Sequence, residues 1–139
     1  MEKDQYEIMR RIEDSFWWYV GMRRIVSALL PPLVPGGASW RILDAGCGTG
    51  ATLDFLAPRG AVVGVDIAAE ALSHCHERGH RLVSRGSIEQ LPFPGASFDL
   101  VTCFDCLHVG REECAVLGRQ RMGFSTPRTT ISGYGGPIQ

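Results

Sequence analysis

The sequence has no apolar run long enough to cross a membrane. Its longest run, residues 25–34, is broken by Ser27 and by Pro31 and Pro32, whereas a membrane-spanning helix needs roughly 20 consecutive apolar residues. The residues after Met1 read Glu-Lys-Asp, so the apolar core of a secretory signal is missing as well. We expect neither a membrane segment nor a signal peptide.

An excess of charge of either sign is also missing. The 14 Lys and Arg residues are balanced by 15 Asp and Glu residues, and the basic residues form no clustered stripe. A nucleic-acid-binding domain would normally carry such a basic patch. We therefore expect no nucleic-acid partner.

The five cysteines form neither an even set nor a regular framework. This pattern fits free thiols in a reducing cytoplasm better than disulfides, so we expect a cytoplasmic location. Cys103, Cys106 and His108 straddle a predicted strand end, and His74 and His76 would point in different directions from a helix. Tetrahedral zinc needs ligands that converge on one point, and we expect no metal site.

The chain has enough apolar residues for one core, since 45% of its 139 residues are hydrophobic. From residue 40 on, apolar segments of strand length alternate with segments of helical periodicity, which predicts an α/β domain with a parallel sheet. The expected strands are 41–44, 61–66, 81–84 and 98–103, and the expected helices are 4–13, 22–30, 68–78 and one that begins over 52–56.

A glycine-rich turn after the first expected strand is the most informative feature. Residues 42–50 read Ile-Leu-Asp-Ala-Gly-Cys-Gly-Thr-Gly. Such a turn lets the backbone approach a ligand closely, and the helix that follows begins with unpaired N–H groups. Asp44, two residues before Gly46, would repel a pyrophosphate. The turn therefore favours a ligand that carries positive charge.

Three further segments extend this motif into a resemblance to a known family. Residues 62–66 read Val-Val-Gly-Val-Asp, and Asp66 lies 20 residues after Gly46, the separation expected across one βαβ unit. With residues 86–101 and the aromatic segment 16–23, the chain resembles the class I S-adenosylmethionine-dependent methyltransferases over about its first 109 residues.

The resemblance implies a Rossmann-like parallel sheet, of which this chain would hold the cofactor-binding half with about four strands. The domains would be a helical cap over residues 1–39, an S-adenosylmethionine-binding core over 40–109 and an irregular tail over 110–139. The activity implied is methyl transfer to a small-molecule acceptor.

The same resemblance assigns roles to individual residues. Asp44, with the backbone near Gly46 and Phe104, would meet the amino group of the cofactor's methionine part, and Asp66 would hold both ribose hydroxyls. Arg23 would reach the methionine carboxylate. The family more often has aspartate where Ser87 stands. The remaining residues expected at the cofactor are Cys47, Gly48 and Gly50 in the turn, and Ile67, Ser87, Ile88 and Glu89 around the adenine.

His108 is the candidate base, because it follows the fourth expected strand, where a base would reach a hydroxyl or phenol acceptor. The family usually has one more residue between the leucine and the valine of this segment, which here reads Leu107-His108-Val109. The alternative is a loop histidine without a catalytic role.

A nicotinamide-dependent oxidoreductase is the alternative enzyme. Gly46, Gly48 and Ala51 also fit the dinucleotide-binding fingerprint, and Asp66 could hold the ribose of NAD. Asp44 and residues 91–101 have no role at such a site. We therefore prefer the methyl-donor interpretation.

The last 30 residues are rich in glycine and poor in periodic apolar residues. We expect a truncated or altered continuation of the family's sequence, without a fifth strand. The strand at 98–103 would then present an open edge and promote self-association. A second alternative follows, in which the chain is a fragment that binds the cofactor without turnover.

Overall fold

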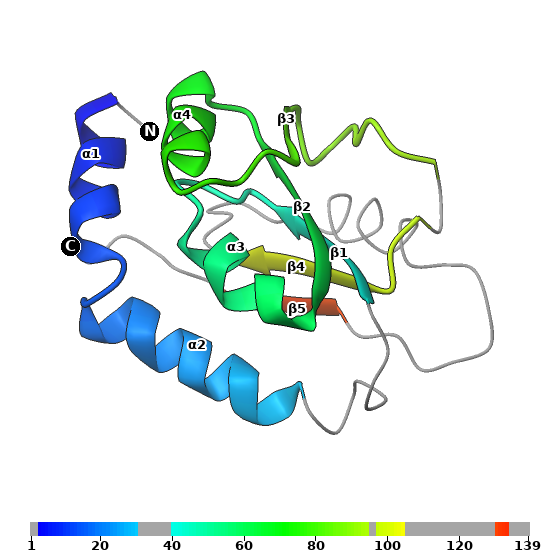
Figure 1. The fold of residues 1–139 in the computed structure, drawn as a ribbon, viewed down its shortest axis with the longest axis horizontal. Helices are drawn as coiled ribbons and strands as arrows, with labels where there is room; N and C mark the ends of the chain where they lie inside the picture. Colours follow the sequence, from blue (N-terminus) through cyan, green and yellow to red (C-terminus); the bar gives the residue numbers. More distant parts are fainter. Residues whose placement is uncertain (1–2, 31–39, 95–96, 105–129, 134–139) are drawn as a thin grey trace.

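Strands and helices alternate from residue 40 to residue 85 in the computed structural model, and two more strands follow (Figure 1). The structure describes residues 3–30, 40–94, 97–104 and 130–133. The helices are α1 (Lys3–Ile12), α2 (Trp17–Leu29), α3 (Ala51–Leu56) and α4 (Ala69–Glu77), with a short 3-10 helix at Ala57–Arg59. The strands are β1 (Trp40–Ala45), β2 (Gly60–Asp66), β3 (Val83–Arg85), β4 (Leu100–Phe104) and β5 (Thr130–Gly133).

The strands form one sheet in the order β3-β2-β1-β4-β5, and all of its pairings are parallel. Asp44 of β1 is in register with Gly64 of β2 on one side and with Thr102 of β4 on the other. The predicted α/β class and the parallel arrangement of the first four strands are confirmed. Because parallel strands end at one edge of the sheet, the residues after β1 and β2 lie close together, at the edge where β4 also ends.

The expectation that residues 110–139 contain no strand is wrong. Thr130–Gly133 forms β5, which pairs with Val101–Phe104 of β4. The edge of β4 is therefore covered in the described structure, and the predicted self-association through an open fourth strand loses its basis. Four residues with one apolar side chain among them carry too weak a pattern to predict a strand from sequence.

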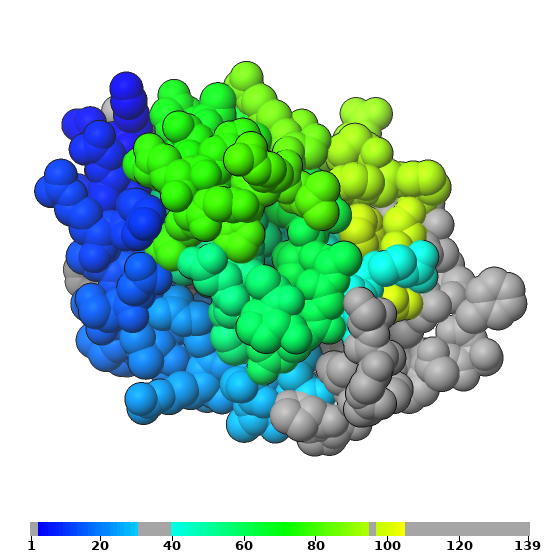
Figure 2. Space-filling view, in the orientation of Figure 1, coloured from blue at the N-terminus to red at the C-terminus, as the bar shows by residue number. Residues whose placement is uncertain are grey.

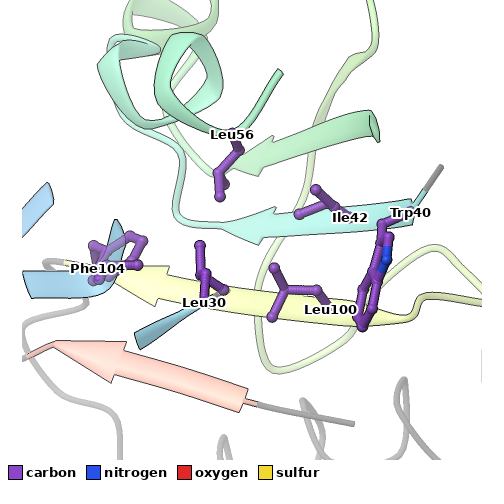
Figure 3. Packing of buried hydrophobic residues seen from close by; sticks show 7 residues of the cluster. Leu30, Trp40, Ile42, Leu56, Leu100 and Phe104 are labelled. Carbon is purple, nitrogen blue, oxygen red and sulfur yellow. The ribbon is translucent and has the colours of Figure 1, made fainter. Parts of the chain in front are cut away.

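Alternation along β1 and β4 sends side chains to two apolar layers. On one face, Ile42 and Leu100 pack with Leu30 beside α2 and Leu56 of α3 (Figure 3). On the other face, Leu43 and Val101 pack with a cluster that includes Phe98, Ile88 and Phe93. Both layers hold the strand ends in fixed positions.

The two N-terminal helices lie along one side of the sheet, next to α3 and α4 (Figure 1). α2 begins at Trp17, five residues earlier than expected, because the aromatic residues before Met22 join the helix. Phe16 and Tyr19 pack against each other with ring centroids 6.0 Å apart. No helix in the described part of the chain is both long and apolar enough to span a membrane.

Candidate functional site

The glycine turn between β1 and α3 is held against the end of β2. The N–H groups of Gly46 and Cys47 both donate to the carbonyl oxygen of Val65, at 2.7 and 3.0 Å. Gly48 and Gly50 have φ of 54° and 97°, in the region that favours glycine. The turn is thus fixed at the carboxyl edge of the sheet, where ligands bind in folds of this type.

Asp66 ties this turn to the segment that follows β2. Its Oδ2 accepts the N–H of Gly48 at 2.9 Å, and its Oδ1 accepts the N–H of Ala68 at 3.0 Å. The residue is 8% exposed. Because a carboxylate has about four acceptor positions, both oxygens can still accept hydrogen bonds from a ligand.

Asp44 lies below the turn at the neighbouring strand end and is buried. The Thr102 hydroxyl on β4 donates to its Oδ1 at 2.8 Å, which follows from the register of the two strands. Together with Asp66 it places two acidic side chains at one edge of the sheet. This arrangement attracts a ligand with positive charge and disfavours an anionic one.

The residues predicted around adenine lie after β2 and β3. Ile67 follows Asp66 and is 66% exposed, although it is apolar. Ile88 is partly buried against the apolar layer beneath the sheet. The Ser87 hydroxyl accepts the N–H of Glu89 at 3.2 Å, so it shapes the local turn.

A pocket separates the N-terminal helices from the glycine turn. It brings together four predicted residues, Arg23, Gly46, Cys47 and Phe104. Arg23 donates from Nη2 to the carbonyl oxygen of Glu13 at 2.7 Å. The other lining residues are Met9, Glu13, Tyr19, Met22, Ala51 and Thr52.

Cys47 faces Cys75 of α4 across the back of the turn, with the two sulfur atoms 3.9 Å apart. Cys75 also lies 3.1 Å from the carbonyl oxygen of Gly48, to which its thiol donates. The hydrogen bond to Cys75, together with burial, raises the pKa of the Cys47 thiol far above its ordinary value. Cys47 therefore stays protonated at neutral pH and contributes packing, since the thiolate is the nucleophilic form.

One face of α1 and the residue that follows this helix also meet the site, although neither was predicted to do so from the sequence. Tyr6 is buried, Met9 reaches to within 3.0 Å of the position that a Cβ on Gly48 would take, and the Glu13 carboxylate accepts the Thr49 hydroxyl at 2.5 Å. Burial and the nearby carboxylates of Asp66 and Glu70 raise the pKa of Tyr6, so its phenol is neutral at physiological pH. The helical spacing of positions 6, 9 and 13 was the available signal.

The candidate base, His108, lies outside the described residues, and so does Cys106, which was considered above as a zinc ligand. His108 and Cys106 fall in the range 105–129, so the role of His108 stays a prediction. Within the described ranges, no three His, Cys, Asp or Glu side chains are grouped as a metal site would require.

Comparisons with known proteins agree with this geometry. A family model described as a methyltransferase domain matches residues 42–120. Among curated proteins, the malonyl-[acyl-carrier protein] O-methyltransferase of Herminiimonas arsenicoxydans is 36% identical over 84 residues, which cover 58% of this chain and 32% of that protein. The chain spans about a third of the length of this relative and of an uncharacterized methyltransferase, YcgJ of Bacillus subtilis.

Two solved structures extend the comparison. The YcgJ structure is 30% identical with a TM-score of 0.57, covering 67% of this chain and 44% of that one. A structure from Methanococcus maripaludis described as an S-adenosyl-L-methionine-dependent methyltransferase has a TM-score of 0.77 over 96% of this chain and 64% of its own. At 14% identity, this second match supports the fold alone. With the family model matched across the glycine turn and Asp66, the chain belongs to the class I S-adenosylmethionine-dependent methyltransferases.

Proposed function

We propose that this chain binds S-adenosylmethionine at the carboxyl edge of β1 and β2, as the cofactor-binding part of an enzyme that methylates a small-molecule acceptor. The observation that carries the proposal is the pair of carboxylates, Asp44 and Asp66, at neighbouring strand ends on either side of the glycine turn. A ligand with a cationic amino group, a sulfonium and a ribose diol matches such a pair.

Each end of the cofactor has a proposed set of contacts. Asp66 accepts hydrogen bonds from the ribose hydroxyls, and its two bonds from backbone N–H groups keep the carboxylate in place. Asp44 and the carbonyl groups near Gly46 and Phe104 face the amino group. Arg23 binds the carboxylate from the cap. Its position in the pocket beside Gly46 supports this last contact.

The adenine is proposed to lie on Ile67, with the backbone of Ile88 at its edge and Ser87 and Glu89 on either side. An apolar side chain that is 66% exposed directly after Asp66 supports this arrangement. A purine ring would cover it and remove apolar surface from water. Ser87 contributes less to adenine recognition than the family's usual aspartate, because a neutral hydroxyl is a weaker hydrogen-bond acceptor than a carboxylate.

The cofactor itself supplies an activated methyl group on its sulfonium. The protein's part is to align the acceptor with the S–CH₃ bond and to exclude water. His108 is the proposed base for a hydroxyl or phenol acceptor.

Calorimetry with S-adenosylhomocysteine and NAD tests the proposal, and adenosine is the control ligand. We expect S-adenosylhomocysteine to bind at least about tenfold more tightly than NAD, a difference of about 1.4 kcal/mol, because the carboxylate pair repels the pyrophosphate. If NAD bound equally well or better, the site would be a dinucleotide site and the proposal would be wrong.

A further inference from the structure

Glu13, which follows α1, is a buried carboxylate outside the proposed contacts to the cofactor. The residue is 2% exposed. Its Oε1 accepts the Thr49 hydroxyl at 2.5 Å and Arg78 Nη2 at 2.7 Å. A buried carboxylate is costly unless it is paired and hydrogen-bonded, and these two partners come from the glycine turn and the end of α4.

Thr49 is fully buried and lies between the two left-handed glycines, Gly48 and Gly50. Gly50, at the N-terminus of α3, has no side-chain cap. The hydrogen bond from the Thr49 hydroxyl to Glu13 therefore ties the glycine turn to the N-terminal helices.

Arg78 extends this anchor to α4. Its guanidinium also contacts Asp14 at 3.1 Å and Asp54 at 2.5 Å, and its side chain is 6% exposed. Figure 2 shows the side chains of α1 lying directly against those of α4. The backbone of Glu13 is held too, because its carbonyl oxygen accepts Arg23 Nη2.

We infer that Glu13 is a positioning residue for the methionine end of the cofactor. The Glu13 carboxylate holds the glycine turn through Thr49, and the Glu13 carbonyl oxygen holds the Arg23 side chain. The amino acid part of the cofactor therefore meets a preformed site. The inference rests on the proposed function, because it concerns the same pocket, which Glu13, Arg23 and Gly46 line together. The ribose and adenine contacts lie beyond this anchor, at Asp66 and Ile67.

The test compares two ligands that differ at the methionine end. S-adenosylhomocysteine carries the amino acid part, and 5′-methylthioadenosine lacks it. We expect Thr49→Val, which removes the hydroxyl, to raise the Kd of S-adenosylhomocysteine about tenfold, the effect of losing one hydrogen bond to a charged group. Glu13→Gln keeps a carbonyl acceptor and loses the charge, so it should raise the same Kd by a smaller factor. The Kd of 5′-methylthioadenosine should change less than about twofold.

Two control variants keep the test specific. Thr49→Ser retains the hydroxyl and should restore the parent ratio of the two Kd values. Asp14→Asn changes an exposed carboxylate that also pairs with the Arg78 guanidinium. This variant should leave the ratio of the two Kd values unchanged. Urea unfolding of each variant shows that it is folded.

The outcomes separate the two proposals. Equal weakening of both ligands in Glu13→Gln and Thr49→Val would mean that the anchor supports only the fold, and the inference would be overturned. An unchanged Kd for S-adenosylhomocysteine would overturn it as well, with the proposed function intact. If the parent bound neither ligand, the proposed function and the inference would both fail.

Discussion

Replacing Asp66 with alanine is expected to weaken S-adenosylhomocysteine binding by about 100-fold, or roughly 2.7 kcal/mol. The carboxylate is proposed to accept both ribose hydroxyls, and hydrogen bonds to a charged group contribute about 1.5–3 kcal/mol each. The same change removes the acceptors for the Gly48 and Ala68 N–H groups, so the turn also loses its tie to β2. Calorimetry on the purified variant measures the loss.

Asp66→Asn and Glu70→Ala are the matched controls for this prediction. The asparagine keeps one carbonyl acceptor and loses the charge, so its affinity should fall between those of the parent and of Asp66→Ala. Glu70 is an exposed carboxylate in the first turn of α4, and its replacement should leave the affinity within about twofold. Parent-like binding by Asp66→Ala would show that the ribose lies elsewhere.

Replacing Arg78 with methionine is expected to lower the free energy of unfolding by about 3–5 kcal/mol, the usual cost of removing one partner from a buried ion pair. Burial alone would lower the pKa of the Arg78 guanidinium, but its hydrogen bonds to Glu13 and Asp14 outweigh burial and raise it. Without Arg78, the Thr49 hydroxyl is the one side-chain donor left to the buried Glu13 carboxylate among the residues that the structure describes. Urea denaturation followed by circular dichroism measures the change.

Arg41→Met is the control for Arg78. Arg41 pairs with Asp99 at 3.2 Å, and its side chain is 57% exposed, so water screens the pair and a much smaller loss is expected. The double variant Glu13→Met with Arg78→Met should recover part of the stability, because it removes both charges together. If Arg78→Met were no less stable than Arg41→Met, the ion pair would contribute nothing measurable.

The sheet and the carboxylate pair were predictable because local sequence determines them. Residues 42–50 combine a buried strand with a glycine turn, and β2 ends on Asp66 at the spacing of a βαβ unit. Asp44 and Asp66 could therefore be assigned to neighbouring strand ends before their contacts were known. Arg23 and Cys47 line the same pocket, and their contacts to the cofactor stay predictions.

Contacts between distant segments were not predictable from the sequence. Glu13 and Arg78 are 65 residues apart, and each looks like an ordinary charged residue of a solvated helix end. Helical spacing places Glu13 on the same face as Tyr6 and Met9, but nothing near Arg78 in the sequence indicates that its side chain is buried or that the two residues pair. β5 was missed for a related reason, since Thr130–Gly133 becomes a strand only by pairing with β4, and long-range pairing leaves little trace in four residues.

The position of the cofactor is the central claim, and a ¹H–¹⁵N correlation spectrum recorded during titration with S-adenosylhomocysteine tests it most directly. We expect the largest shifts at the amides of Gly46, Cys47, Gly48 and Ile67, which lie at the carboxyl ends of β1 and β2. The amides of Arg41 and Ala61, at the opposite ends of these strands, should shift least. Shifts centred on Arg41 and Ala61, or no shifts at saturating ligand, would contradict the proposed site.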